Sequence, residues 1–525
     1  MRRAYLSLLF LLVARSLLVT AQQPSPPAPT LHVESQLVIL DTVVTDFKGD
    51  IVHGLHKDDF AVYENGVKQT ILNFSSSGDL PAIPNAPRKD RNGHDDWGNS
   101  PLTMIVVDEM DTPFQELAYA RDCVERYLRA QPSELRSPTV LLWVNDRGIH
   151  ALSSFTRDRQ TLLAALDRQP PSYPGRLMRG DAAEQVAASF AALQQAALFS
   201  RGEAGKKEII WVGRSFPSID PIGLDDYQRT LLAKAVRSTT DLLLASRASV
   251  YVIDPTVTGS ASDDDAAQEV DTLQLATNSS VKDPFASSFN INLFVSETGG
   301  KYFRGRNDLE QQIAASENRG LSYYTLTYVP SSPIQDGAYR QIDVRMRNTN
   351  LRAQTKRGYY AEAPASSTSP TKLDTSLDAS DLRFDLYEAA VTGMEYTGLG
   401  LHVEDCARET TSLVTTCTVT VDTRSLSFIQ QESGDERSTF LTVVASLDAK
   451  GKLINDTINR LTIAIPRQQA AGIDAGFSKL HLQTIVPLHA TAVRIIIRDS
   501  SGRIGTADVP VSQVPRLVAN EAPRK

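Results

Sequence analysis

The stretch Leu102–Thr112, LTMIVVDEMDT, decides the fold of this chain. Five of its first six residues are apolar, which is typical of a strand covered on both faces in a parallel sheet. Acidic residues follow at once, and Thr112-Pro113 then opens a helix that the apolar spacing predicts over residues 114–130. Ligands of parallel α/β sheets bind where loops and helix N-termini converge at the carboxyl ends of the strands. The segment Asp108–Thr112 is therefore the first candidate site.

Strand and helix patterns alternate from Pro101 to about Ala363, which predicts βα units and a mainly parallel sheet. The predicted strands cover residues 102–107, 139–144, 209–212, 249–253 and 323–329. The predicted helices cover residues 114–130, 158–168, 182–199, 227–246 and 308–317. We expect short terminal antiparallel strands at 342–346 and 358–360.

Strand-rich segments flank this α/β region. Residues 31–74 predict a small β domain, in which Asn65-Gly66 between β-forming residues indicates a hairpin. Linker-like composition at 75–100 and 364–371 delimits the α/β domain at 101–363, and residues 372–525 predict a second β-sandwich. Cys406 and Cys417 lie in that last segment and are candidates for a bridge between neighbouring strands, whereas Cys123 is expected to be a buried apolar residue on a helix.

The first 21 residues have the pattern of a secretory signal peptide: Arg2-Arg3, an apolar run, and small residues near Ala21. A Pro-rich tether at 22–30 follows. We expect an exported protein in the periplasm, at the cell surface or in the medium, with no membrane span in the mature chain. The formal net charge of −8 is spread along the chain, and this distribution does not favour nucleic acid as a partner.

The chain resembles exported proteins that carry a von Willebrand factor A-related domain of the acidobacterial type. The resemblance implies a Rossmann-like α/β domain, here with flanking β-sandwiches, that binds a protein ligand through a carboxylate of the partner and a bound Mg²⁺ or Mn²⁺. It implies no catalytic activity. The matching segments are Val43–Asp46, Asp58–Phe60, Glu64–Gly66, Leu102–Ala120, Glu297–Gly300, Tyr323–Pro330 and Lys356–Tyr360.

The metal motif of such domains, Asp-x-Ser-x-Ser, is degenerate here. Asp108 matches its first residue, Met110 replaces the first serine, and Thr112 retains a hydroxyl. A thioether is a poor ligand for a hard cation. The resemblance also implies a threonine near residues 180–182, where none occurs, and an aspartate after the strand at 209–212, where Gly213-Arg214-Ser215 stands instead. We therefore expect no cofactor, with a weakened Mg²⁺ or Mn²⁺ site at Asp108 and Thr112 as the alternative.

Local roles explain the same residues without a metal. Thr112 would cap the helix, with Pro113 at its first position and Gln115 at its third. Asp111 would complement the helix dipole, and Asp108 would be a buried carboxylate bonded to loop amides.

The preferred hypothesis is an exported, non-catalytic protein-binding or adhesion module with an unknown protein ligand. Its binding edge would comprise the loops 108–112, 170–182 and 213–220, including Asp111, Asp181, Arg214 and Ser215. One alternative is a structural envelope protein in which the α/β domain is a scaffold. A less favoured alternative is a metal-dependent hydrolase or phosphatase, because an Asp-x-Asp phosphatase motif needs an acid at position 110, which is Met.

Overall fold

The computed structural model describes residues 37–79, 83–84, 86–89, 95–110, 112–145, 148–171, 182–214, 216, 224–256, 284–285, 290–304, 307–332, 334, 336–361, 386–387, 389–409, 412–430, 435–465 and 476–517. The predicted signal peptide and tether lie outside these residues and stay predictions. Within the described residues, no helix combines the length and the apolar character needed to cross a bilayer.

A central sheet with the strand order β10-β8-β7-β11-β12-β13 confirms the predicted α/β fold. The five strands from β8 to β13 run parallel, and β10 and the short β9 pair antiparallel with β8. Every residue of β7, β11 and β12 is buried, as their apolar runs predict. The strands are β7 (Leu102–Asp108), β8 (Glu134–Asn145), β9 (Gly148–Ala151), β10 (Thr156–Asp158), β11 (Lys207–Val212), β12 (Ala248–Ile253) and β13 (Tyr302–Phe303).

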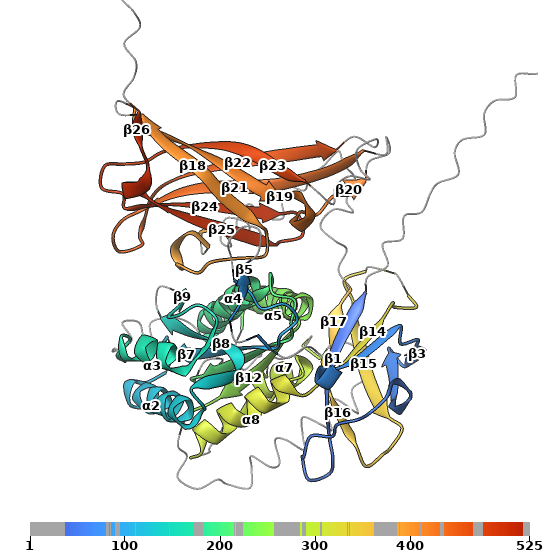
Figure 1. Ribbon diagram of the computed structural model, residues 1–525. Coiled ribbons are helices and arrows are strands. Elements are labelled where there is room, and N and C mark those ends of the chain that lie inside the picture. The colour runs from blue at the N-terminus through green and yellow to red at the C-terminus, as the bar shows by residue number, and fades with distance from the viewer. Residues whose placement is uncertain are drawn as a thin grey trace, which may run out of the picture. The chain divides into compact units, whose positions relative to one another are not determined.

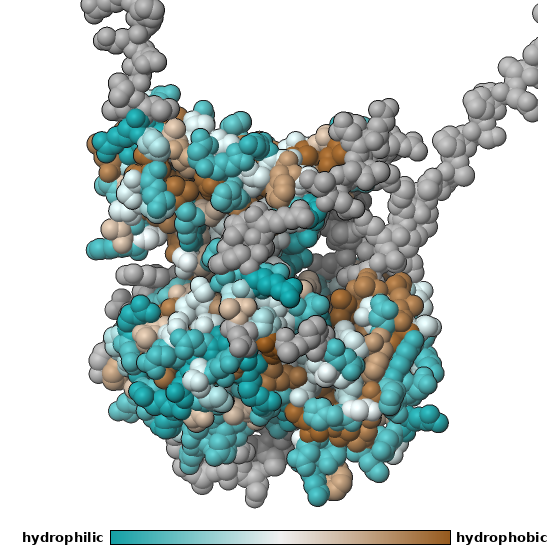
Figure 2. All heavy atoms as spheres, viewed as in Figure 1, coloured by the Kyte–Doolittle hydropathy of each residue, from teal (hydrophilic) through white to brown (hydrophobic). Residues whose placement is uncertain are grey.

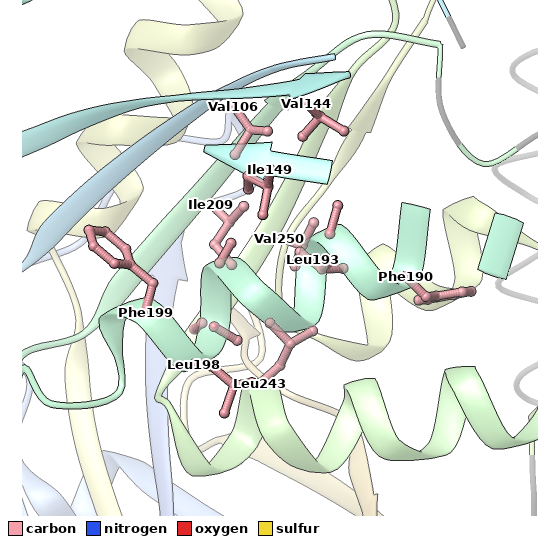
Figure 3. Close-up of a cluster of buried hydrophobic side chains, with 14 of the residues drawn as sticks. Val106, Val144, Ile149, Phe190, Leu193, Leu198, Phe199, Ile209, Leu243 and Val250 are labelled. Atoms are coloured by element: carbon pink, nitrogen blue, oxygen red, sulfur yellow. The ribbon is translucent and has the colours of Figure 1, made fainter. Parts of the chain in front are cut away.

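Helices cover both faces of this sheet (Figure 1). One face packs against α2 (Phe114–Ala130), α3 (Arg159–Asp167) and α8 (Leu309–Leu321). The other face packs against α4 (Ala182–Ser200), α5 (Asp226–Ala245) and α7 (Ile291–Glu297). Figure 3 shows side chains of α4 and α5, among them Leu193 and Leu243, beside Val106, Ile209 and Val250 of the sheet.

Two four-stranded sheets join the N-terminal strands to strands from beyond the α/β region. Their strand orders are β16-β1-β14-β4 and β17-β15-β2-β3. A short pair, β5 with β6, stands apart from both sheets. The bounds are β1 (Val38–Thr45), β2 (Phe60–Glu64), β3 (Val67–Gln69), β4 (Asn73–Ser76), β5 (Arg88–Lys89), β6 (Asp95–Asp96), β14 (Tyr324–Tyr328), β15 (Tyr339–Met346), β16 (Arg352–Gln354) and β17 (Gly358–Tyr360), with 3-10 turns η1 (Lys57–Asp59) and η2 (Ser77–Asp79).

This arrangement corrects one prediction. The strand expected at 323–329 was assigned to the parallel sheet, but β14 instead pairs antiparallel with β1 and β4. Its sequence explains the difference, because Thr325 and Thr327 alternate with larger side chains, and such alternation is typical of antiparallel strands with one more polar face. The N-terminal β domain predicted at 31–74 is thus completed by residues 324–360.

The predicted hairpin at Asn65-Gly66 is confirmed between β2 and β3. Both turn residues have positive φ values, 48° and 80°, as a two-residue hairpin turn that matches the strand twist requires.

The C-terminal region folds into two largely antiparallel sheets around one core, as predicted. The sheet orders are β23-β19-β18-β26 and β20-β21-β24-β25, with β22 paired to β21. Cys406 and Cys417 face each other on β18 and β19 and form a disulfide, and Cys123 is fully buried on α2. The bounds are β18 (Leu401–Glu409), β19 (Val414–Asp422), β20 (Ile429–Gln430), β21 (Glu436–Leu447), β22 (Leu453–Ile465), β23 (Phe477–Ile485), β24 (Ala492–Asp499), β25 (Ile504–Pro510) and β26 (Arg516–Leu517), with η4 (Thr423–Ser425) and η6 (Val511–Gln513).

Candidate functional site

The three chain segments that follow β7, β11 and β12 lie at the same edge of the sheet, where these neighbouring strands have their carboxyl ends. Val107 pairs with Val212, and Val212 pairs with Ile253, so that Asp108, Gly213 and Asp254 follow in register. The strand β7 is followed in the chain by its neighbour on one side, β8, and later by its neighbour on the other side, β11. This reversal is the topological switch point at which open α/β sheets bind ligands.

Asp108 is fully buried at this point. Its Oδ1 atom accepts a hydrogen bond from the Met110 N–H at 2.9 Å, and its Oδ2 atom lies 3.4 Å from Nε1 of Trp211. The hypothesis that Asp108 is a buried carboxylate bonded to a loop amide is therefore supported by its geometry.

Thr112 is also fully buried, and its hydroxyl oxygen accepts a hydrogen bond from the Arg214 N–H at 2.9 Å. This bond corrects the predicted helix cap, since α2 begins at Phe114 with Pro113 at the N-cap position and no side-chain cap. The physical reason is the close approach of the first residues after β11, which brings the Arg214 N–H within hydrogen-bonding distance of the Thr112 hydroxyl oxygen. Thr112 thus ties the loop after β7 to the loop after β11.

Gly213 makes this approach possible. A Cβ atom at this position would lie 2.5 Å from Cβ of Asp108 and 2.9 Å from Oγ1 of Thr112. No side chain fits there without moving Asp108. Asp108, Thr112, Gly213 and Arg214 therefore form one packed unit, which we call the switch-point lock.

Two further carboxylates at this edge have protein partners. Oε2 of Glu109 accepts a hydrogen bond from Trp143 Nε1 at 2.5 Å. Oδ2 of Asp254 accepts one from the Tyr302 hydroxyl at 3.0 Å and lies 3.6 Å from Nε of Arg304. Burial, followed by the charge of Asp254, raises the pKa of Tyr302 well above its usual value.

Two arginine side chains of this edge reach solvent. The side chains of Arg214 and Arg304 are 45% and 48% exposed, and Nη1 of Arg214 lies 3.7 Å from Oε2 of Glu116. Both guanidinium groups lower the pKa of Tyr302 and thus offset part of the rise, which places them within electrostatic range of the same phenol.

The described residues do not fit a divalent cation. Mg²⁺ and Mn²⁺ require several hard oxygen ligands. Of the positions that the resemblance implies, only Asp108 and Thr112 supply side-chain oxygen atoms among the described residues, and Gly213-Arg214 stands where a further aspartate is expected. No group of three or more His, Cys, Asp or Glu side chains with metal-binding geometry occurs within the described ranges.

The remaining predicted edge residues, Asp111, Asp181 and Ser215, lie outside the described residues. The sequence reasoning included Glu109 only as a member of the loop 108–112, without a role of its own, and it missed Tyr302 and Arg304 as parts of this edge. For Glu109 a signal existed, because an acid directly after a buried strand next to a buried Trp143 requires a partner. For Tyr302 and Arg304 no local signal existed, because the two-residue strand β13 was not predicted.

A second polar cluster lies at the opposite, amino-terminal end of β11. Arg247 donates two hydrogen bonds to the Asp41 carboxylate, at 2.7 and 3.0 Å, and Lys206 pairs with Glu208. Lys356 is buried beside them, and its amine has no hydrogen-bond partner among the described residues. The cluster joins β1 and the loop after β16 to the α/β domain.

No family model matches the chain, and no curated protein sequence matches it. Solved structures with partial similarity include the human COPII-coat protein Sec24c, at 11% sequence identity and a TM-score of 0.25, covering 50% of this chain and 44% of that chain. The SpRpn10 VWA domain matches at 17% identity and a TM-score of 0.21, covering 42% and 97%. Proximal thread matrix protein 1 from the mussel byssus, with a zinc-occupied MIDAS motif, matches at 10% identity and a TM-score of 0.23, covering 43% and 49%.

This chain spans less than half the length of Sec24c and of the byssus protein. Likeness at these identities and TM-scores carries no argument about function, and the fold rests on the strand pairing described above.

Proposed function

We propose that this chain is an exported, non-catalytic protein-binding module of the von Willebrand factor A type, whose partner binds at the switch-point edge. The observation that carries the proposal is the switch-point lock. Its hydrogen bond from Arg214 to Thr112 fixes the loop backbone while the Arg214 side chain stays about half exposed. A fixed loop that presents a charged side chain is typical of a recognition surface.

Recognition in this proposal needs no metal ion. Arg214 and Arg304 replace the cation as positive groups at the edge, and guanidinium groups bind carboxylates directly with two parallel hydrogen bonds. The non-catalytic part is supported by the carboxylates of Asp108, Glu109 and Asp254. Each accepts a hydrogen bond from the protein, as structural carboxylates do.

The test compares the proteins of an envelope extract that are retained by the immobilised full chain and by variants. Arg214→Glu should abolish retention of the specific partner, because it reverses the side-chain charge while keeping the backbone N–H that bonds to Thr112. Arg460→Glu changes an equally exposed arginine on β22 and should leave retention unchanged. Equal retention by wild type and Arg214→Glu, with unfolding midpoints also equal, would reject the proposal.

The structural envelope role is a second candidate, favoured by an exposed hydrophobic surface on the N-terminal β domain. This domain is built from strands that precede and strands that follow the α/β domain in the sequence, and Figure 2 shows hydrophobic residues gathered over the region of β14 and β17. Its exposed large hydrophobic residues include Leu37, Val67, Leu72 and Ile334. If this role holds, Leu72→Lys will release the chain from the envelope fraction, and Arg214→Glu will not.

A further inference from the structure

The free edge of the C-terminal sandwich carries a site that is independent of the switch-point edge. Strand β18 pairs with β19 from Leu401 to Arg408, with one register shift at Glu404, but on its other side it pairs with β26 only at Arg408 and Glu409. Between Leu401 and Ala407 no described strand pairs with this outer side. The Arg408 N–H donates to Pro515 O on that side at 2.9 Å, and backbone groups alternate along a strand, so the Cys406 N–H faces the same way.

The last strand of the facing sheet, β25, has a partly free edge as well. Its outer side meets residues 396–397 through a bridge from Thr397 to Gly505 and a hydrogen bond from Thr506 N to Tyr396 O at 3.0 Å. Beyond Thr506, no described strand pairs with that side as far as Val509. The two free edges belong to the two sheets of one sandwich, and a groove of about 410 Å³ lies between them.

The floor of this groove is the sandwich core itself. Leu401 and Cys406 are core residues, and Val403, Ala507 and Val509 are partly buried against that core. An extended segment laid along β18 would place every second side chain on this apolar floor. The disulfide from Cys406 to Cys417 fastens β18 to β19, and this keeps the receiving edge ordered before anything binds.

The rim of the groove is acidic. The polar residues that line it are the acids Glu395, Glu404, Asp405 and Asp508, together with His402 and Gln513, and no described lysine or arginine is among them. The Glu404 carboxylate accepts hydrogen bonds from Thr420 on β19 and Lys479 on β23, at 2.6 and 2.7 Å, and is thus held on the side of β18 away from the free edge. Asp508 is paired with the buried Arg494 on β24, so Asp405 is the exposed acid of β18 on which the charge preference mainly depends. A register shift between Val403 and Asp405 leaves Glu404 and Asp405 exposed in succession.

We propose that this groove binds an extended segment of another protein, in which lysine or arginine alternates with aliphatic residues, by adding it to β18 as an extra strand. Main-chain hydrogen bonds would supply affinity, and the apolar floor and acidic rim would select side chains of alternating type. A second copy of this chain is a poorer occupant, because edge-to-edge pairing would bring Glu404 and Asp405 against the same acids. Acids and bulges protect free edges against such self-pairing, and they leave the edge open to a cationic strand.

The test uses fluorescein-labelled Lys-Val-Lys-Val-Lys as the probe and the full chain, with binding followed by fluorescence anisotropy. We expect saturable binding, no binding of Glu-Val-Glu-Val-Glu, and at least about tenfold weaker binding of a probe methylated on alternate backbone amides, which cannot pair as a strand. Asp405→Lys should weaken binding at least about tenfold. Asp456→Lys alters an exposed aspartate on β22, three strands away from β25 in the sheet order, and should not change it.

A second variant fills the groove without changing its charge, and it therefore tests the shape of the groove separately from its acidic residues. Ala507→Trp should fill the groove and abolish binding, whereas Ala464→Trp, at an exposed position on β22, should not. Should Ala507→Trp fail to fold, the exposed Asp405→Lys variant decides alone. Binding that is equal for Asp405→Lys and wild type, or for the methylated and unmethylated probes, would overturn the proposal. So would a wild-type dimer that Ala507→Trp splits, because a second copy would then occupy the groove.

Discussion

The absence of a side chain at Gly213 determines which groups come into contact at the switch-point edge. Its missing side chain lets the loop after β11 approach Asp108 and Thr112, and the Arg214 N–H of that loop then bonds to the hydroxyl oxygen of Thr112. The proposed mode of recognition, by arginine side chains and loop shape, follows from that single close approach.

Gly213→Ala should destabilise the α/β domain by about 1–3 kcal/mol, because the new methyl group overlaps the Asp108 side chain. Urea unfolding followed by the fluorescence of the buried Trp143 and Trp211 measures this loss in the α/β domain itself. Gly78→Ala is the matched control, since its new Cβ would meet only Ser76 Oγ at an ordinary 3.6 Å. Equal losses in both variants would contradict the packed lock.

Thr112→Val keeps the shape of the side chain and removes its acceptor. The buried Arg214 N–H would lose its partner, which costs about 1–3 kcal/mol. Amide hydrogen exchange should therefore accelerate at Arg214, while the first amides of α2 keep their wild-type rates. Acceleration at the start of α2 alone would instead indicate that Thr112 caps that helix.

The sequence indicated where this site lies but not what each residue there bonds to. The apolar run before Asp108 and the helix after Pro113 place the edge correctly, because both patterns are local. The partner of Thr112 was predicted wrongly, since a capping box can be read within four residues whereas Arg214 lies 102 positions away. Tyr302 and Arg304 were missed for the same reason.

For strand β14, hydrophobic periodicity predicts the strand itself but not the sheet to which it belongs. Its existence was predicted, but its sheet was not, because pairing with β1 joins residues nearly 300 positions apart. The pairing also brings together charged groups that no local pattern relates, namely Asp41 on β1, Lys206 and Lys207 at β11, Arg247 after α5 and Lys356 after β16.

Because Lys356 is buried, the free energy of unfolding of the α/β domain should increase as the pH rises. Burial, and then the charges of Arg247, Lys206 and Lys207 against that of Asp41, lower its pKa to about 7. The unfolded chain holds the proton up to a pKa of about 10.4. Between these values the unfolded state binds more protons than the folded state, so the free energy of unfolding increases with pH across this window.

Lys356→Met removes the buried amine and should stabilise the domain at pH 6 by about 1–4 kcal/mol. The advantage over wild type should shrink by pH 9, as measured by urea unfolding at both values. Lys450→Met, at an exposed lysine in a turn, should show no such pH-dependent difference. An advantage that is equal at pH 6 and pH 9 would show that Lys356 does not titrate in this way.

At the scale of the whole molecule, the α/β region is an insertion between the two halves of the N-terminal β domain. The boundaries 101–363 predicted from composition cut through this unit, because they keep β14 to β17 and discard their partners β1 to β4. Composition does not indicate which distant strands pair. The segment 75–100, predicted as a linker, contains the strands β5 and β6, and the predicted linker 364–371 lies outside the described residues.

A fragment of residues 37–361 should therefore unfold cooperatively, whereas residues 101–363 should not hold β14 to β17 in ordered sheets. Two-dimensional amide NMR spectra of both fragments measure this directly, with the dispersed signals of Tyr324–Tyr328 present only in the longer one. Dispersed signals for these residues in both fragments would mean that the α/β domain organises them alone.

In the proposed function, the switch-point edge binds its partner without a metal ion. The most direct test is the unfolding temperature of the full chain in EDTA, Mg²⁺ and Mn²⁺, for wild type and Asp108→Asn. A cation at a hundred times its dissociation constant would add about 2.7 kcal/mol of stability. We predict the same temperature in all three conditions. A saturable rise with Mg²⁺ or Mn²⁺ that disappears in Asp108→Asn would contradict the claim and restore a metal-dependent adhesion site.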